Sequence, residues 1–280
     1  MDSGHGAQLE LQNDLRRALA AGELALHYQP KVDTVGGMVH GVEALLRWTH
    51  PVLGPVAPAD FIPLAERFGL IVAIGNWVID EACRQMGEWN DAGLRMRVAI
   101  NLSTYQLRQG DLVARIQRAL ERHGVEPAQL TCEIGEAAVM ADTRSATQVL
   151  AALGAIGLQL AIDDFGSGAT RLLSLRRLRV DQLKLARGIV EQIETSADAL
   201  AVADATVRLG HALGLRVVAV GVETDGQAER LFQLHCDELQ GFQFARPMPA
   251  ARLLAWTRGA KPEGGVDFAP SLQMGLDVPL

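Results

Sequence analysis

Two adjacent aspartates, Asp163 and Asp164, end an apolar run of strand length that begins at residue 158, and a glycine-containing turn starts at Gly166. Such a run is typical of a buried strand, so both carboxylates are expected where the strand leaves the core. Adjacent carboxylates repel each other unless a positive group lies beside them, and a divalent cation meets that need. The alternative is an ordinary turn, because Asp and Gly are common turn residues.

Other predicted strands also end in polar side chains. The full set is Gln29, Glu43, Asn101, Glu133, Asp163 with Asp164, Lys184 and Gln240. In a parallel barrel these ends converge on one mouth. Their carboxylate and amide oxygens suit Mg²⁺, Mn²⁺ or Ca²⁺, and the absence of His and Cys from the set argues against zinc. A lysine beside such a site would orient or help to deprotonate a water on the metal, which predicts phosphodiester hydrolysis.

Each of these residues also has a purely structural interpretation. Asn101 alone fits a turn or a helix cap, and Lys184 alone fits a solvated surface residue. Glu136 fits either a cap of the following helix or a brace for the turn after Asp164, and Arg47 fits either a partner of Glu43 or another role. His27, His40 and His211 are expected to be packed or surface residues rather than ligands. The chemical prediction therefore rests on the joint placement of the strand-end residues.

The elements that must position these side chains alternate along the chain. Strands are predicted at 24–30, 38–48, 96–103, 130–133, 158–164, 182–185, 216–220 and 238–242, and helices at 9–19, 59–69, 74–89, 112–123, 143–154, 198–213 and 227–234. A chain of 280 residues could form two domains, but the alternation without a linker favours one closed (β/α)8-type barrel. Residues 1–8 and 259–280 are expected to be flexible. The arginines at 171, 176, 177 and 179 are expected on a solvated helix face rather than in a phosphate site.

Composition excludes several classes of function. A net charge of -7 argues against non-specific binding of DNA, RNA or an anionic membrane. The N-terminus lacks a basic and apolar leader, and no apolar run is long enough to span a bilayer, so a soluble cytoplasmic protein is expected. Cys83, Cys132 and Cys236 are widely spaced and odd in number, which predicts buried reduced thiols rather than disulfides or a zinc site.

Over residues 9–255 the chain resembles the EAL domain family, the bacterial cyclic di-GMP phosphodiesterases. The matching stretches are Tyr28-Gln29-Pro30, Gly41-Val42-Glu43-Ala44-Leu45-Leu46-Arg47-Trp48, Phe61-Ile62-Pro63-Leu64-Ala65-Glu66, Asn101-Leu102-Ser103, Glu133-Ile134-Gly135-Glu136, Asp163-Asp164-Phe165-Gly166, Leu183-Lys184 and Gln240-Gly241-Phe242. The resemblance implies a TIM-like (β/α)8 barrel whose first strand is antiparallel to the rest. It also implies hydrolysis of cyclic di-GMP to the linear dinucleotide by a two-metal site.

The resemblance assigns roles to individual residues. It implies that Mg²⁺ or Mn²⁺ is held by Glu43, Asn101, Glu133, Asp163 and Asp164, that Lys184, Glu43 and Asp164 are catalytic, and that Gln29, Arg47 and Gln240 contact guanine or phosphate. Members of the family often dimerise near the turn after the second aspartate, so a homodimer is among the expected assemblies.

Two positions depart from the family pattern. Where the family reads Ala-Glu-Gly-Val-Glu-Thr, this chain has Val220 in place of the first glutamate, which the resemblance implies is a ligand of the second metal. Where the family reads Leu-Lys-Ile-Asp, this chain has Ala186 in place of the aspartate. We therefore expect a receptor that binds cyclic di-GMP, passes its occupancy to a protein partner and has lost or strongly impaired catalysis. A slow phosphodiesterase with one metal is the second expectation, and an interaction module without nucleotide binding is the third.

Overall fold

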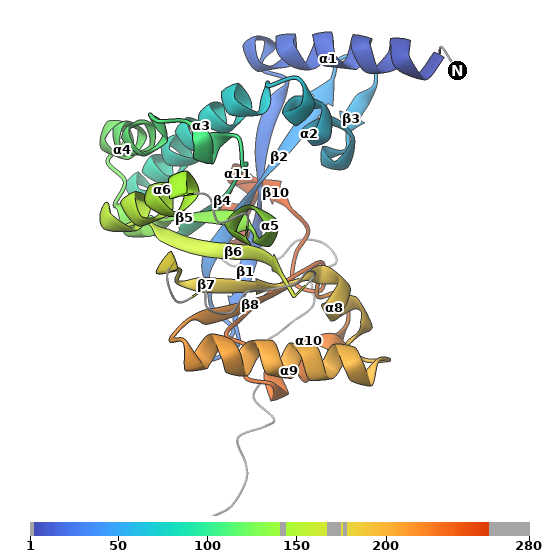
Figure 1. Cartoon of the computed structure of the whole chain (residues 1–280), viewed down its shortest axis with the longest axis vertical. Coiled ribbons are helices and arrows are strands. Elements are labelled where there is room, and N and C mark those ends of the chain that lie inside the picture. Colours follow the sequence, from blue (N-terminus) through green and yellow to red (C-terminus); the bar gives the residue numbers. More distant parts are fainter. Residues whose placement is uncertain (1–2, 141–143, 167–174, 176–177, 258–280) are drawn as a thin grey trace, which may run out of the picture.

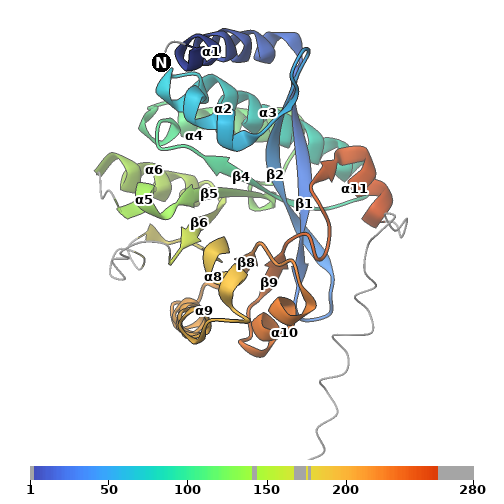
Figure 2. The ribbon, with the colours of Figure 1, turned by 90° about the vertical axis from the view of Figure 1, so that its right-hand side faces the viewer.

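The computed structural model describes residues 3–140, 144–166, 175 and 178–257. Within this part of the chain, eight strands close into a barrel (Figures 1 and 2): β1 Leu24–Asp33, β2 Val39–His50, β4 Arg97–Leu102, β5 Leu130–Gly135, β6 Gln159–Phe165, β7 Gln182–Leu185, β8 Arg216–Val220 and β9 Glu238–Gln240. Neighbouring strands are parallel from β2 round to β9. The strand β1 closes the barrel by pairing antiparallel with both β2 and β9. The prediction of a TIM-like barrel with an antiparallel first strand is thus confirmed.

Helices cover the outside of the barrel (Figure 2). They are α1 Ser3–Ala21, α2 Pro58–Arg67, α3 Ile71–Asp91, α4 Leu112–His123, α5 Glu136–Met140, α6 Arg144–Ala155, α8 Arg187–Gln192, α9 Ala197–Ala212, α10 Asp225–Gln233 and α11 Ala250–Thr257. Two short strands extend the sheet, because β3 Gly54–Val56 pairs with the end of β2 and β10 Met248–Pro249 pairs with β1. The short 3-10 helices η1 Gln106–Arg108 and η2 Pro127–Gln129 precede α4 and β5.

The strands are built from residues that suit a sheet buried on both faces. Leu130, Cys132 and Ile134 of β5 are fully buried, and Val217 and Ala219 of β8 are fully buried in a cluster with side chains of α8 and α9. The barrel interior, however, contains charged groups. Lys31 of β1 contacts Glu133 of β5, and these strands are not neighbours in the sheet, so the contact crosses the interior of the barrel. The interior therefore carries chemistry as well as packing.

Several predicted boundaries shift. The first helix begins at Ser3, so α1 includes most of the segment 1–8 that was expected to be flexible. The helix predicted at 74–89 extends in both directions as α3. The expected flexible tail at 259–280, the arginines at 171, 176 and 177 and the expected dimer region after Gly166 lie outside the described residues.

The cysteine prediction is confirmed, because Cys83, Cys132 and Cys236 are all free and buried. Among the helices that the structure describes, none combines the length and the apolar character needed to cross a bilayer.

Candidate active site at the barrel mouth

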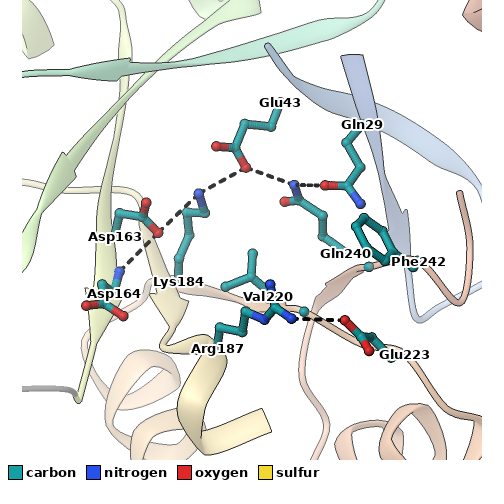
Figure 3. Close-up of a pocket in the computed structure, with 12 residues that line it drawn as sticks. Gln29, Glu43, Asp163, Asp164, Lys184, Arg187, Val220, Glu223, Gln240 and Phe242 are labelled. Carbon is teal, nitrogen blue, oxygen red and sulfur yellow. Dashed lines mark hydrogen bonds and ion pairs between the residues drawn. The ribbon is translucent and has the colours of Figure 1, made fainter. Parts of the chain in front are cut away.

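A cavity of about 320 Å³ opens at the end of the barrel where the parallel strands finish (Figure 3). It is lined by Gln29, Glu43, Asp163, Asp164, Lys184, Arg187, Val220, Gly221, Glu223, Gln240, Gly241 and Phe242. Six of these twelve residues belong to the strand-end set that the sequence predicts, namely Gln29, Glu43, Asp163, Asp164, Lys184 and Gln240. The convergence expected for a parallel barrel therefore brings them to one place.

The irregular C-terminal end of β6 places the paired aspartates in the wall of this cavity. Pairing between β6 and β7 is irregular from Ile162 to Phe165, which is typical of a bulge that redirects side chains. Asp164 has a φ of 58°, a left-handed conformation that aspartate adopts more readily than most residues. The backbone N–H of Gly166 donates a hydrogen bond of 3.2 Å to Oε2 of Glu136. This contact supports the second of the two roles considered for Glu136, in which its side chain braces the turn after Asp164.

Lys184 is the centre of the charged cluster. Its Nζ lies 3.2 Å from Oε2 of Glu43 and 3.1 Å from Oδ1 of Asp163, and it also pairs with Oε2 of Glu133. The side chain is almost completely buried. Burial opposes its charge, but the three carboxylates outweigh that effect and hold the pKa of Lys184 well above its usual value. The ammonium is therefore protonated at neutral pH, and the interpretation of Lys184 as a solvated surface residue is excluded.

Glu43 is held by amides as well as by Lys184. Nδ2 of Asn101 donates to Oε1 of Glu43 at 2.8 Å, and Nε2 of Gln240 donates to Oε2 at 2.8 Å. The same Nε2 lies 3.1 Å from Oε1 of Gln29, which extends the network across the barrel (Figure 3). Burial alone would raise the pKa of Glu43, but Lys184, Lys31 and the two amide donors lower it to about 2. Glu43 is thus a carboxylate throughout the physiological range.

Lys31 is a member of the cluster that sequence reasoning missed. Its Nζ donates to Oε1 of Glu133 at 2.7 Å, and both side chains are less than 5% exposed. Glu133 thus has one ammonium on each oxygen, although burial and the neighbouring Glu43 still raise its pKa. The predicted first strand ended at Pro30, three residues before β1 ends at Asp33, so it left Lys31 out. A charged residue directly after an apolar strand segment was the available signal, but the same pattern also fits a strand that has reached solvent.

Arg47 does not line this cavity. It lines a second cavity, also of about 320 Å³, together with Asn101 and apolar side chains of α2 and α3. Its Nη1 donates to the backbone oxygen of Leu46 at 2.8 Å rather than to Glu43. The hydrogen bond between Asn101 and Glu43 nevertheless joins the walls of the two cavities, because Glu43 lines the first and Asn101 lines the second.

The predicted histidine assignments agree with the structure. His27 is half-buried, while His40 and His211 are exposed. Nε2 of His211 lies 3.0 Å from Oδ2 of Asp237. None of the three lines either cavity among the described residues.

The donors at the mouth match the chemistry of a hard divalent cation. Glu43, Asp163 and Asp164 contribute carboxylates to the cavity wall, while Asn101 contacts Glu43 and Glu133 contacts Lys184. Oxygen donors of this kind suit Mg²⁺ and Mn²⁺. In the described part of the chain, no three acidic, histidine or cysteine side chains are already arranged to hold a metal ion. The carboxylates of Glu43, Glu133 and Asp163 converge instead on the ammonium of Lys184, so the set fits a cation by its chemistry once this lysine shifts.

The fold and the mouth define a class: TIM-like barrels with an antiparallel first strand and a cluster of carboxylates and lysine at the C-terminal ends of the parallel strands. Comparison with known proteins identifies the family. The profile of the EAL domain matches residues 12–247, and the chain therefore belongs to the EAL domain family.

Among characterised relatives, the chain is 47% identical over 256 residues to the bifunctional diguanylate cyclase/cyclic di-GMP phosphodiesterase MucR of Pseudomonas aeruginosa, covering 91% of this chain and 37% of that protein. It is 39% identical over 267 residues to the cyclic di-GMP phosphodiesterase NbdA of the same organism, covering 95% of this chain and 34% of that protein. The chain thus spans about a third of the length of these relatives.

Solved structures agree with this assignment. The phosphodiesterase PaMucR, in its complex with c-di-GMP, is 47% identical and superimposes with a TM-score of 0.85, covering 87% of this chain and 99% of that one. The EAL enzyme Bd1971, in a form with cAMP and cyclic di-GMP bound, is 28% identical with a TM-score of 0.86, covering 91% of this chain and 70% of that one.

Proposed function

We propose that this chain binds cyclic di-GMP at the barrel mouth, as part of signalling by this dinucleotide, and that its phosphodiesterase activity is lost or strongly impaired. The observation that carries the second part is the aliphatic side chain of Val220 in the wall of the cavity (Figure 3). By the family pattern this position belongs to a glutamate that binds the second metal. Valine has no donor atom, so it binds no cation.

Ala186 adds to the loss. It follows β7 at the position of the family's aspartate, it is buried, and its backbone N–H donates to the backbone oxygen of Phe165. Its methyl side chain places no charge near the mouth. Glu223, three residues after Val220, also lines the cavity. Its carboxylate is paired with Arg187 at 3.1 Å.

Support for nucleotide binding comes from a buried polar atom in the cavity wall that lacks a partner in the described part of the chain. Oε1 of Gln240 is buried and has no hydrogen-bond partner in the described part of the chain, although leaving such an atom unsatisfied is costly. A donor on the ligand, such as a guanine N–H, would satisfy it. The second cavity, with Arg47 and Asn101 in its wall, offers room beside the first for a ligand that has two bases. The structures of two relatives in complex with cyclic di-GMP support the same ligand.

The residues that would hold one Mg²⁺ or Mn²⁺ are Glu43, Asn101, Glu133, Asp163 and Asp164. A cation bound there would neutralise charge on the phosphate oxygens and lower the pKa of the attacking water. Without a cation, the ammonium of Lys184 contacts the carboxylates of Glu43 and Asp163, and these carboxylates help to raise its pKa. With a cation on these carboxylates, Lys184 would shift and act beside the site as a positive charge and a hydrogen-bond donor.

Loss of a second cation removes a contact that stabilises the transition state of an in-line displacement. The loss of one such contact typically costs about 3 kcal/mol, or roughly a hundredfold to a thousandfold in rate. Ground-state binding of the dinucleotide depends on the remaining residues, so it is expected to survive.

A second candidate is a slow phosphodiesterase that works with one cation. It is favoured by the phosphodiesterase relatives and by the presence of Lys184, Glu43 and Asp164 together at the mouth. The two candidates differ in turnover and not in ligand.

The test combines calorimetric titration with cyclic di-GMP and a turnover assay with Mg²⁺ or Mn²⁺. Binding with turnover near background supports the receptor, whereas turnover on the order of 1 s⁻¹ or faster would reject it. Measurable turnover that is roughly a hundredfold slower supports the one-cation enzyme. Absence of binding up to high micromolar ligand would reject both and leave an interaction module that no longer binds nucleotide.

Repair variants test the cause of the loss. We expect Val220→Glu alone to restore little turnover, because Ala186 still leaves the second site short of a carboxylate. The double variant Val220→Glu/Ala186→Asp is expected to increase turnover at least tenfold over either single variant. Strong recovery by Val220→Glu alone would show that the aspartate next to the lysine is dispensable.

A further inference from the structure

Arg187 is a cation at the open rim of the cavity, at the first position of α8. Its side chain is 59% exposed. The other cation among the described cavity-lining residues is Lys184, which is buried and already engaged by three carboxylates. Arg187 therefore has charged donors that an anion entering the cavity can reach.

The position of Arg187 is fixed by the neighbouring backbone. Gly221 has a φ of 83°, and a Cβ atom built on it would lie 2.6 Å from Cγ of Arg187. The stem of Arg187 thus packs directly on the backbone of Gly221, and only glycine leaves room for it. Arg187 and Val220 both line this cavity (Figure 3), and Val220 directly precedes Gly221 in the chain. Because Val220 is uncharged, Arg187 has no carboxylate partner from that position.

Two exposed ion pairs restrain the guanidinium group of Arg187 only weakly. Its Nη2 lies 3.1 Å from Oε1 of Glu223, and its Nε lies 2.7 Å from Oε1 of Glu191. Both glutamates are nearly half exposed, and exposed ion pairs of this kind contribute little. A guanidinium has five N–H donors in a planar arrangement that matches two oxygens of a phosphate. Arg187 can therefore bind a phosphate with donors that are free or that Glu223 releases.

We infer that Arg187 is a further ligand-binding residue that binds one phosphodiester group of the cyclic dinucleotide, and that Glu223 competes with this phosphate for the guanidinium. Arg187 would then supply positive charge to the ligand on the side of the cavity where the proposed function places the missing second cation. This inference rests on the proposed function, because it assigns a contact to the same ligand.

The test compares dissociation constants for cyclic di-GMP by calorimetry in the presence of Mn²⁺. Arg187→Met, which retains much of the stem that packs on Gly221, is expected to weaken binding about tenfold. Arg187→Lys retains the charge and is expected to recover part of that loss. Glu223→Gln removes the competitor and is expected to tighten binding about threefold. If Glu223 and the phosphate compete for Arg187, then Arg187→Met and Glu223→Gln change the dissociation constant in opposite directions.

The matched control is Arg208→Met. Arg208 is an exposed arginine on α9 that pairs with Asp204 at 2.9 Å and does not line the cavity. We expect this variant to bind as the parent chain does. Titration with Mn²⁺ alone provides a second control, because Arg187→Met should leave the affinity for the cation within about twofold if its contact is with phosphate.

The outcomes separate this inference from the proposed function. If the parent chain binds the dinucleotide and Arg187→Met binds equally well, the inference is overturned and the proposed function stands. If Glu223→Gln weakens binding, Glu223 positions Arg187 and the competition is rejected. A large change in Mn²⁺ affinity in Arg187→Met would reject the phosphate contact. Failure of the parent chain to bind would overturn both.

Discussion

At the scale of single residues, the mouth balances two buried ammonium groups against three carboxylates. Lys31 and Lys184 both contact Glu133, and Lys184 also contacts Glu43 and Asp163. Buried charges are tolerated only when they are paired and hydrogen-bonded. Asp164 adds a further carboxylate to the cavity wall, so the carboxylates outnumber the two ammonium groups, which favours the binding of a cation. Val220 and Ala186, in contrast, add no charge to this site.

The charge on Glu43 makes stability depend on pH. Its pKa in the folded state is lowered to about 2, from an ordinary value of 4.5, so ionised Glu43 stabilises the fold at pH values above 4.5. This contribution is lost as pH falls from 4.5 toward 2. We expect Glu43→Gln to be less stable than the parent chain at pH 6, with a difference that shrinks as pH decreases. Urea titrations from pH 6 to pH 3, with a chelator present, measure this, and a constant difference would contradict the assignment.

Lys31 has a testable structural role. Replacing it with methionine leaves Oε1 of Glu133 buried without its ammonium partner, although Lys184 still contacts the other oxygen. We expect Lys31→Met to lower the free energy of unfolding by roughly 3 kcal/mol. Lys31→Met/Glu133→Gln should recover part of the loss, because the unpaired charge is then gone. The matched control, Arg208→Met in an exposed pair, should lose less than about 1 kcal/mol, and an equal loss in both variants would reject a buried ion pair.

At the scale of elements, the rim depends on the close approach of two segments. The backbone N–H of Val222 donates to the oxygen of Gln240, and the N–H of Gln243 donates to the oxygen of Val222. Gly241 lies between these contacts, and a Cβ atom on it would be 1.9 Å from the oxygen of Val222. The rim residues Gln240 and Phe242 are therefore placed by a backbone contact that only glycine permits.

This contact predicts the effect of an alanine substitution. Gly241→Ala must push the two segments apart, so we expect a loss of roughly 2 kcal/mol in stability and weaker nucleotide binding. Gly154→Ala is the control, because Gly154 lies in α6 with open space around its Cβ position. In a helix this change is expected to stabilise by roughly 0.5 to 1 kcal/mol. Chemical denaturation of both variants measures the contrast, and similar effects would refute the close approach.

At the scale of the whole molecule, closure of the barrel buries residues from every part of the chain. Cys83 of α3, Cys132 of β5 and Cys236 before β9 are all 0% exposed. Burial raises the pKa of Cys132, and it raises the pKa of Cys83 and of Cys236 to about 12. The thiols are thus protonated and inaccessible in the folded state.

The thiols therefore report on global unfolding. We expect a thiol-reactive disulfide reagent at pH 8 to modify the native protein slowly, at the rate at which the barrel opens, and to modify all three cysteines at once in denaturant. Addition of a saturating ligand should slow the native reaction further. Rapid modification of even one cysteine in the native protein would show that part of the barrel opens separately.

The local sequence determined much of this protein. Alternating strand and helix patterns were sufficient to predict the barrel, because each element carries its own periodicity and turn residues. The strand-end positions of Glu43, Asp163 and Lys184 were sufficient to predict that they meet, since parallel strands finish at one edge. The absence of a donor at Val220 is likewise a property of residue type alone.

Only the tertiary structure decided which side chains touch. The contact of Lys31 with Glu133, the separation of Arg47 from the first cavity and the position of Arg187 over Gly221 depend on the register of strands and on closure by an antiparallel β1. These partners lie far apart in the sequence, and no local pattern fixes the distance across a barrel. Residue types therefore set which groups gather at the mouth, while packing in three dimensions sets which of them pair and which remain available to a ligand.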